Sequence, residues 1–159
     1  MTATVLPVIG KPAPDFNLPA TTGEAISLKQ FKGKKTVVLY FYPKDDTPGC
    51  TREACDLRDL SAEFEKHNAV ILGVSTDSME SHQAFAAKHK LPFPLLSDSE
   101  AEVAKKYGVY KQKNLYGKKS MGIERTTFIV DRTGRVAQIY PRVKVEGHVD
   151  QLIEFVTEE

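Results

Sequence analysis

Two runs of β-branched and aromatic residues, Thr36–Tyr42 and Ala69–Ser75, constrain the fold of this chain more than any other feature. Each run is continuously apolar, which is typical of a strand that is covered on both faces. Between the runs, apolar residues recur every three or four positions from Thr51 to His67, and this spacing predicts an amphipathic helix. The order of strand, helix and strand indicates an α/β fold.

The remaining segments complete this pattern. Capping signals or helical spacing predict three further helices: Asp77 to about Lys90, the segment from Ser97–Glu100 to Tyr107 with Gly108 as its C-cap, and His148–Glu158. Turn residues between apolar segments predict two hairpins: Phe16–Leu18 with Ala25–Leu28, and Thr126–Val130 with Val136–Tyr140. We therefore expect one domain over residues 1–159, with a central mixed β-sheet, flanking helices and an N-terminal hairpin extension.

Composition excludes several partner classes. The chain is 41% apolar and 27% charged, and its 22 basic and 21 acidic residues give a net charge of +1. This balance gives no reason to expect nucleic acid or an anionic membrane as a partner. No apolar run reaches the roughly 20 residues that span a bilayer. Met1–Gly10 has no basic segment and contains Pro7, unlike a signal peptide, so we expect a cytoplasmic protein.

The chain has two cysteines, Cys50 and Cys55, where the first strand gives way to the following helix. At a helix N-terminus, unpaired N–H groups and the helix dipole stabilise a thiolate. Gly49 allows close backbone approach, and Thr47 offers a hydroxyl within one helical turn. In a reducing compartment, two such cysteines are more often catalytic or metal-binding than structural.

The spacing of the two cysteines distinguishes between several possible roles for them. Four residues intervene, so Cys-x-x-Cys is absent, as is a Cys-x₅-Arg loop. A structural zinc site needs about four ligands, and no histidine is near either cysteine in sequence. If both cysteines share one helix, their Cα atoms lie about 8–9 Å apart. A disulfide needs roughly 4.4–6.8 Å, so its formation would require the first turn to unwind. An ordinary N-terminal turn with a convenient cap is the simpler alternative.

A family resemblance adds to this interpretation. Pro43-x-x-x-Thr47-x-x-Cys50 resembles the active-site motif of the peroxiredoxins. The run Tyr42–Cys55 closely resembles their bacterioferritin comigratory protein (PrxQ) branch, and the resemblance includes Gly10–Phe16 and Gly122–Asp131.

The resemblance implies a thioredoxin-like fold and thiol-dependent reduction of hydroperoxides. It implies that Cys50 is the peroxidatic cysteine and Cys55 the resolving cysteine, with Pro43, Thr47 and Arg125 as the other active-site residues. By sequence alone, Arg125 is better explained as an exposed strand-edge arginine paired with an acid such as Glu124; the resemblance reverses that preference.

The resemblance also implies thioredoxin as the reductant, although glutaredoxin stays open. Because both thiols lie in one chain, we expect a monomer. The proposed chemistry requires no metal, haem or flavin cofactor.

Two other functions would use the same thiols: a thiol–disulfide exchange or redox-sensing module, and a metal chaperone, which the lack of a nearby histidine disfavours. Elsewhere, we expect His82 and His89 to face solvent and Lys111–Lys119 to form a solvated basic loop. Phe16, Phe41 and Tyr42 are expected in the core.

Overall fold

A computed structural model describes residues 5–158 of the chain. Met1–Thr4, part of the N-terminal stretch expected not to be a signal peptide, lie outside these residues, as does Glu159. In chain order the elements are β1 (Asn17–Leu18), β2 (Ile26–Ser27), the 3-10 helix η1 (Leu28–Phe31), β3 (Thr36–Phe41), α1 (Pro48–Asp59), α2 (Ser61–Lys66), β4 (Ala69–Ser75), α3 (Met79–His89), β5 (Leu95–Ser97), α4 (Glu102–Lys106), β6 (Tyr110–Leu115), β7 (Lys118–Ile123), β8 (Thr126–Val130), β9 (Val136–Tyr140) and α5 (His148–Glu158).

The central sheet has five strands in the order β5-β4-β3-β8-β9. β3 pairs in parallel with β4, which pairs in parallel with β5, whereas β3–β8 and β8–β9 are antiparallel. The expected mixed sheet is therefore confirmed. The N-terminal hairpin is confirmed too, because β1 pairs antiparallel with β2.

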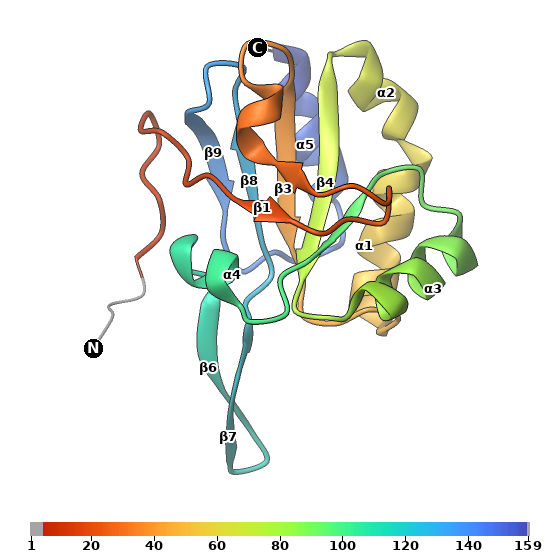
Figure 1. The fold of residues 1–159 in the computed structure, drawn as a ribbon, viewed down its shortest axis with the longest axis vertical. Coiled ribbons are helices and arrows are strands. Elements are labelled where there is room, and N and C mark those ends of the chain that lie inside the picture. The colour runs from red at the N-terminus through yellow and green to blue at the C-terminus, as the bar shows by residue number, and fades with distance from the viewer. Residues whose placement is uncertain (1–4, 159) are drawn as a thin grey trace.

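Alternating residues of β3 enter two separate cores. Val37, Leu39 and Phe41 pack on one face, with Phe16 and side chains from α4. Val38 and Tyr40 pack on the other face together with Tyr42, which follows the strand, and with side chains from α1, α2, α3 and α5. Figure 1 shows the N-terminal segment crossing the front of the sheet and α5 lying behind it. The expectation that Phe16, Phe41 and Tyr42 are core residues is confirmed.

The prediction of a single helix from Thr51 to His67 is wrong. Two helices, α1 and α2, meet at Leu60, whose backbone (φ −108°, ψ 10°) leaves the helical conformation. Leu57 before the break and Phe64 after it are both fully buried in the same core. The apolar spacing therefore continues across the break and gives no sign of it. The short strand β5 was also not expected.

Two helix starts also differ from the expected ones. Ser78, rather than Asp77, caps α3 by accepting a hydrogen bond from the Ser81 N–H at 3.1 Å. α4 starts only at Glu102, because Ala101 before it has a left-handed backbone with a φ of 59°. The Asp98 carboxylate accepts the N–H groups of two α4 residues at 3.2 and 2.8 Å. Gly108 has a φ of 70° just beyond the end of α4, close to its expected C-cap position.

The segment expected to be a basic loop, Lys111–Lys119, is a β-hairpin. β6 and β7 pair antiparallel as a ribbon separate from the central sheet, and the ribbon projects from the body at the bottom of Figure 1. The turn residues Tyr116 and Gly117 have φ angles of 53° and 77°, which suit a tight hairpin turn. Its many polar residues give no alternation of apolar residues, so no sequence pattern identifies these strands.

The sheet brings two distant parts of the chain to one edge. The carboxyl ends of β3 and β4 lie at this edge because the strands are parallel. The amino end of β8 lies there too, since Thr126 pairs with Phe41. The loop that follows β3 and the residues that precede β8 therefore meet. Within residues 5–158, none of the helices has both the length and the apolar character needed to cross a membrane.

Candidate active site

The start of α1 positions Cys50. Thr47 is the N-cap and Pro48 the first helical residue, so Cys50 lies in the first turn. The cysteine is 1% exposed and is a free thiol. Helix N–H groups and the helix dipole at this position stabilise negative charge on its sulfur.

Arg125 lies against this sulfur. Its Nη2 donates a hydrogen bond to Cys50 Sγ at 3.2 Å, and its Nη1 donates to Glu53 Oε1 at 2.7 Å. The alternative of an exposed arginine paired with Glu124 is wrong, because the side chain is 15% exposed and Glu124 pairs with Lys111. The antiparallel β3–β8 pairing brings Arg125 to the helix start, which no local sequence pattern could show.

Sequence reasoning missed Glu53. It lies three residues after Cys50 on α1, so both side chains share one face of the helix. Burial raises the pKa of Glu53 to about 7, although Arg125 opposes this increase. Its second carboxylate oxygen, Oε2, has no hydrogen-bond partner among the described residues. The spacing of three residues from Cys50 was the available signal.

Thr47 and Pro43 bound the loop between β3 and α1. The Thr47 hydroxyl donates a hydrogen bond to the Lys44 carbonyl at 2.8 Å. Its hydrogen is therefore occupied, and its oxygen is left as an acceptor. Both Thr47 and Pro43 are half-buried.

Cys55 is half-buried and free, and it lies on the same uninterrupted helix as Cys50. The expectation of two separate thiols in one helix is confirmed. Regular helix geometry places their Cα atoms about 8–9 Å apart, beyond the range of a disulfide. Bond formation therefore requires α1 to change conformation.

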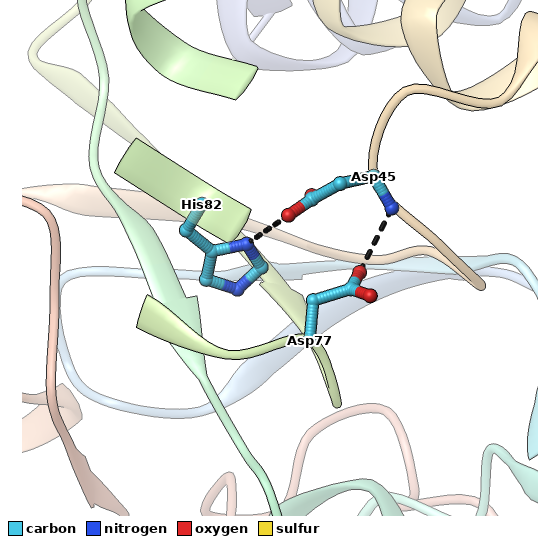
Figure 2. A group of neighbouring side chains, drawn as sticks. All are labelled: Asp45, Asp77 and His82. Carbon is cyan, nitrogen blue, oxygen red and sulfur yellow. Dashed lines mark hydrogen bonds and ion pairs between the residues drawn. The ribbon is translucent and has the colours of Figure 1, made fainter. Parts of the chain in front are cut away.

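One cluster near the site has ligand types suited to a metal ion: Asp45, Asp77 and His82, whose candidate atoms lie within 4.8 Å of one another (Figure 2). Each residue is already engaged in hydrogen bonds with protein groups. The expectation that His82 faces solvent is wrong, because it is 0% exposed. His89 is partly buried, and its Nε2 lies 3.4 Å from Asp46 Oδ1.

Comparison with known proteins identifies the family to which this chain belongs. The model of the AhpC/TSA family matches residues 9–139. The chain belongs to this family. It is 50% identical over 146 residues to Peroxiredoxin Bcp of Bacillus subtilis (strain 168), covering 92% of each chain. It is 52% identical over 145 residues to a putative peroxiredoxin bcp of Coxiella burnetii, covering 91% of this chain and 95% of the relative.

A solved structure of the Xanthomonas campestris bacterioferritin comigratory protein has a TM-score of 0.88 and 41% identity, covering 95% of this chain and 98% of that one. That structure was solved to study the alkyl peroxide reduction activity of the Xanthomonas campestris protein. The family resemblance and the thioredoxin-like fold expected from the sequence are therefore confirmed.

Gly49 leaves the space that Arg125 occupies in this AhpC/TSA family member. A Cβ atom at Gly49 would lie 3.1 Å from Arg125 Nη2, closer than ordinary contact. Gly49→Ala should therefore displace the guanidinium and slow oxidation of Cys50 by hydrogen peroxide roughly three- to tenfold. Competition kinetics on reduced protein measure this rate. Gly122→Ala is the matched control, because the three atoms nearest to its Cβ all belong to the flexible Lys113 side chain, at 3.4 Å or more. Equal rates for both variants would contradict the prediction.

The raised pKa of Glu53 has a consequence for stability. The folded protein holds this proton up to about pH 7, whereas the carboxyl of the unfolded chain loses it near its ordinary pKa of 4.5. The stability that Glu53 contributes is thus present below pH 4.5 and lost as pH rises to 7. The free energy of unfolding of Glu53→Gln, relative to that of the parent, should increase by about 2–3 kcal/mol from pH 5 to pH 8. Urea unfolding of both proteins at pH 5 and at pH 8 tests this. The same difference in free energy of unfolding at the two pH values would contradict the prediction.

Proposed function

We propose that this protein is a peroxiredoxin that reduces hydrogen peroxide and organic hydroperoxides through Cys50. The observation that carries the proposal is the Arg125 guanidinium donating to the Cys50 sulfur at the start of α1. A thiolate stabilised by a cation and a helix N-terminus is a strong nucleophile. The relatives named as peroxiredoxins support the same chemistry.

In the first step, the Cys50 thiolate attacks the terminal peroxide oxygen. An S–O bond forms as the O–O bond breaks, and the sulfur gives two electrons to the peroxide. The departing oxygen takes a proton and leaves as water or an alcohol. We assign Arg125 and the helix N–H groups to the developing negative charge, and the Thr47 oxygen to the peroxide O–H. Pro43 shapes and stiffens the approach.

In the second step, Cys55 resolves the sulfenic acid. The Cys55 sulfur bonds to the Cys50 sulfur, the S–O bond breaks, and hydroxide leaves with the Cys55 proton as water. The two cysteines are five residues apart on α1, so this step is coupled to unwinding of the helix start.

A dithiol reductant then returns the protein to its starting state by thiol–disulfide exchange. We propose thioredoxin as that reductant, with glutaredoxin as the other candidate. We also propose that residues 1–159 act as one domain and as a monomer, because both thiols lie in one chain. A cycle that starts from two reduced thiols fits the cytoplasm.

The test is to mix reduced protein with hydrogen peroxide and measure the rate at which Cys50 is oxidised. We expect a second-order rate at least about a thousandfold above that of a free thiol, because positioning and charge stabilisation both contribute. Oxidation no faster than a free thiol would reject the peroxidase and favour a thiol–disulfide exchange module.

A further inference from the structure

A buried polar network holds the loop that precedes α1. The Asp45 carboxylate accepts hydrogen bonds from the Tyr42 hydroxyl at 2.6 Å and from the Ser81 hydroxyl at 2.8 Å. Its Oδ2 also lies 2.7 Å from His82 Nδ1. Figure 2 marks this contact with a dashed line. The Asp45 N–H donates to Asp77 Oδ2 at 2.8 Å. One loop residue is thereby bonded to the end of β3, the end of β4 and the start of α3.

The hydrogen bond between Asp45 and His82 joins two buried side chains. His82 Nε2 lies 2.9 Å from the Leu96 carbonyl, which can only accept, so Nε2 carries a hydrogen. Nδ1 faces Asp45 Oδ2, so the imidazole and the carboxyl group share one hydrogen in this contact. Burial raises the pKa of Asp45, but the hydrogen bonds from His82 and Tyr42 outweigh it and leave the pKa below its ordinary value. The two side chains thus form a buried hydrogen-bonded pair, and loss of either one leaves the other buried with an unsatisfied polar group.

The position of this pair relative to the reacting thiol matters. Asp45 lies two residues before the N-cap Thr47 and five before Cys50. His82 belongs to α3 and is bonded to β5, neither of which contains a reacting cysteine. The loop is therefore attached to parts of the fold that need not move when α1 unwinds. An exposed ion pair, Asp46 with Lys88, lies at the same loop, and exposure makes such a pair contribute little.

We propose that the Asp45–His82 pair is a positioning device for the peroxidase reaction. It fixes the loop Pro43–Thr47, so that the Cys50 sulfur stays at Arg125 in the helical state and unwinding is confined to residues after Thr47. The inference rests on the proposed function. Neither residue touches the sulfur or the peroxide; both act through the loop that carries Thr47 and the start of α1.

The two steps of the cycle should respond differently when the pair is lost. Oxidation of Cys50 requires the aligned helical state, whereas disulfide formation requires α1 to open. His82→Gln and Asp45→Asn should therefore slow Cys50 oxidation about 10- to 100-fold. The same variants should leave the rate of disulfide formation unchanged or increase it. A general loss of stability would not separate the two rates in this way.

The experiment measures both rates on full-length reduced protein, well below the unfolding temperature of each variant. Samples are mixed with hydrogen peroxide, quenched with an alkylating reagent after set times, and analysed by mass spectrometry for thiol, sulfenic acid and disulfide. Tyr107→Phe is the buried control, because its hydroxyl bonds to the Pro14 carbonyl in the other core. Asp46→Asn is the exposed control at the same loop. Both should keep the parental ratio of the two rates.

A lower ratio of oxidation to disulfide formation in His82→Gln and Asp45→Asn supports the inference. An unchanged ratio, with both rates lowered together or neither changed, overturns it. If these variants do not fold, Ser81→Ala, which removes one hydrogen bond to Asp45, must lower the ratio by a smaller factor. Slow oxidation of the parent protein itself would instead reject the proposed function, so the two failures are distinguishable.

Discussion

Replacing Cys50 with serine should abolish peroxide consumption. The first step needs a polarisable anionic sulfur, and a serine hydroxyl at the same position is neither ionised near neutral pH nor easily oxidised. The substitution changes one atom at a site that is 1% exposed, so the fold should be retained. Peroxide remaining in solution, measured over many enzyme equivalents with a dithiol donor present, gives the result directly.

Cys55→Ser is the matched control for Cys50→Ser. It should consume one equivalent of peroxide rapidly and then stop at the sulfenic acid, which a dimedone label would identify on Cys50. Two outcomes would contradict the assigned roles. One is residual consumption in Cys50→Ser; the other is full multiple-turnover activity in Cys55→Ser with thioredoxin alone.

Replacing Arg125 with alanine should lower the second-order rate of Cys50 oxidation about 100- to 1000-fold. The guanidinium donates to Cys50 Sγ at 3.2 Å and is held in place by Glu53 at 2.7 Å. Removing it withdraws a donor aimed at the charge that develops during the reaction, and such donors are worth about two to three powers of ten. It also leaves the Glu53 carboxyl buried without its cation.

Arg125→Lys distinguishes charge from geometry. Lysine keeps the positive charge but lacks the planar fork that reaches Cys50 and Glu53 together, so it should recover only part of the rate. Arg132→Ala, at the exposed turn between β8 and β9, should retain the parental rate. A loss of less than about threefold in Arg125→Ala would remove Arg125 from the mechanism.

The sequence predicted those features that depend on local pattern. The strand Ala69–Ser75 and the helix His148–Glu158 were predicted with their observed bounds, because each carries a strong apolar pattern. The position of Cys50 at the start of a helix was also predictable from local sequence. The role expected of Arg125 required the family resemblance, since the β3–β8 pairing is a contact between distant segments.

Buried polar residues were the main failure of sequence reasoning. His82 and His89 lie seven residues apart on a predicted helix, and both are expected from the sequence to face solvent. His82 is instead fully buried, and three oxygen atoms lie around its ring nitrogens. Glu53 was passed over for a similar reason, since a glutamate on a helix is normally exposed. His82 becomes recognisable only when its tertiary partner Asp45 is in place. For Glu53 the spacing from Cys50 was a local signal, and the tertiary partner Arg125 accounts for its position.

Amide hydrogen exchange across residues 47–56 tests the central claim most directly, namely that one turnover converts two separate thiols on an intact helix into a disulfide on an unwound one. Reduced protein and protein oxidised with one equivalent of hydrogen peroxide are compared, with β3 and β4 as internal references. The account predicts that exchange in this segment accelerates at least about tenfold on oxidation while the two strands stay protected. A Cys50–Cys55 disulfide, verified by mass, with unchanged protection across the segment would contradict it.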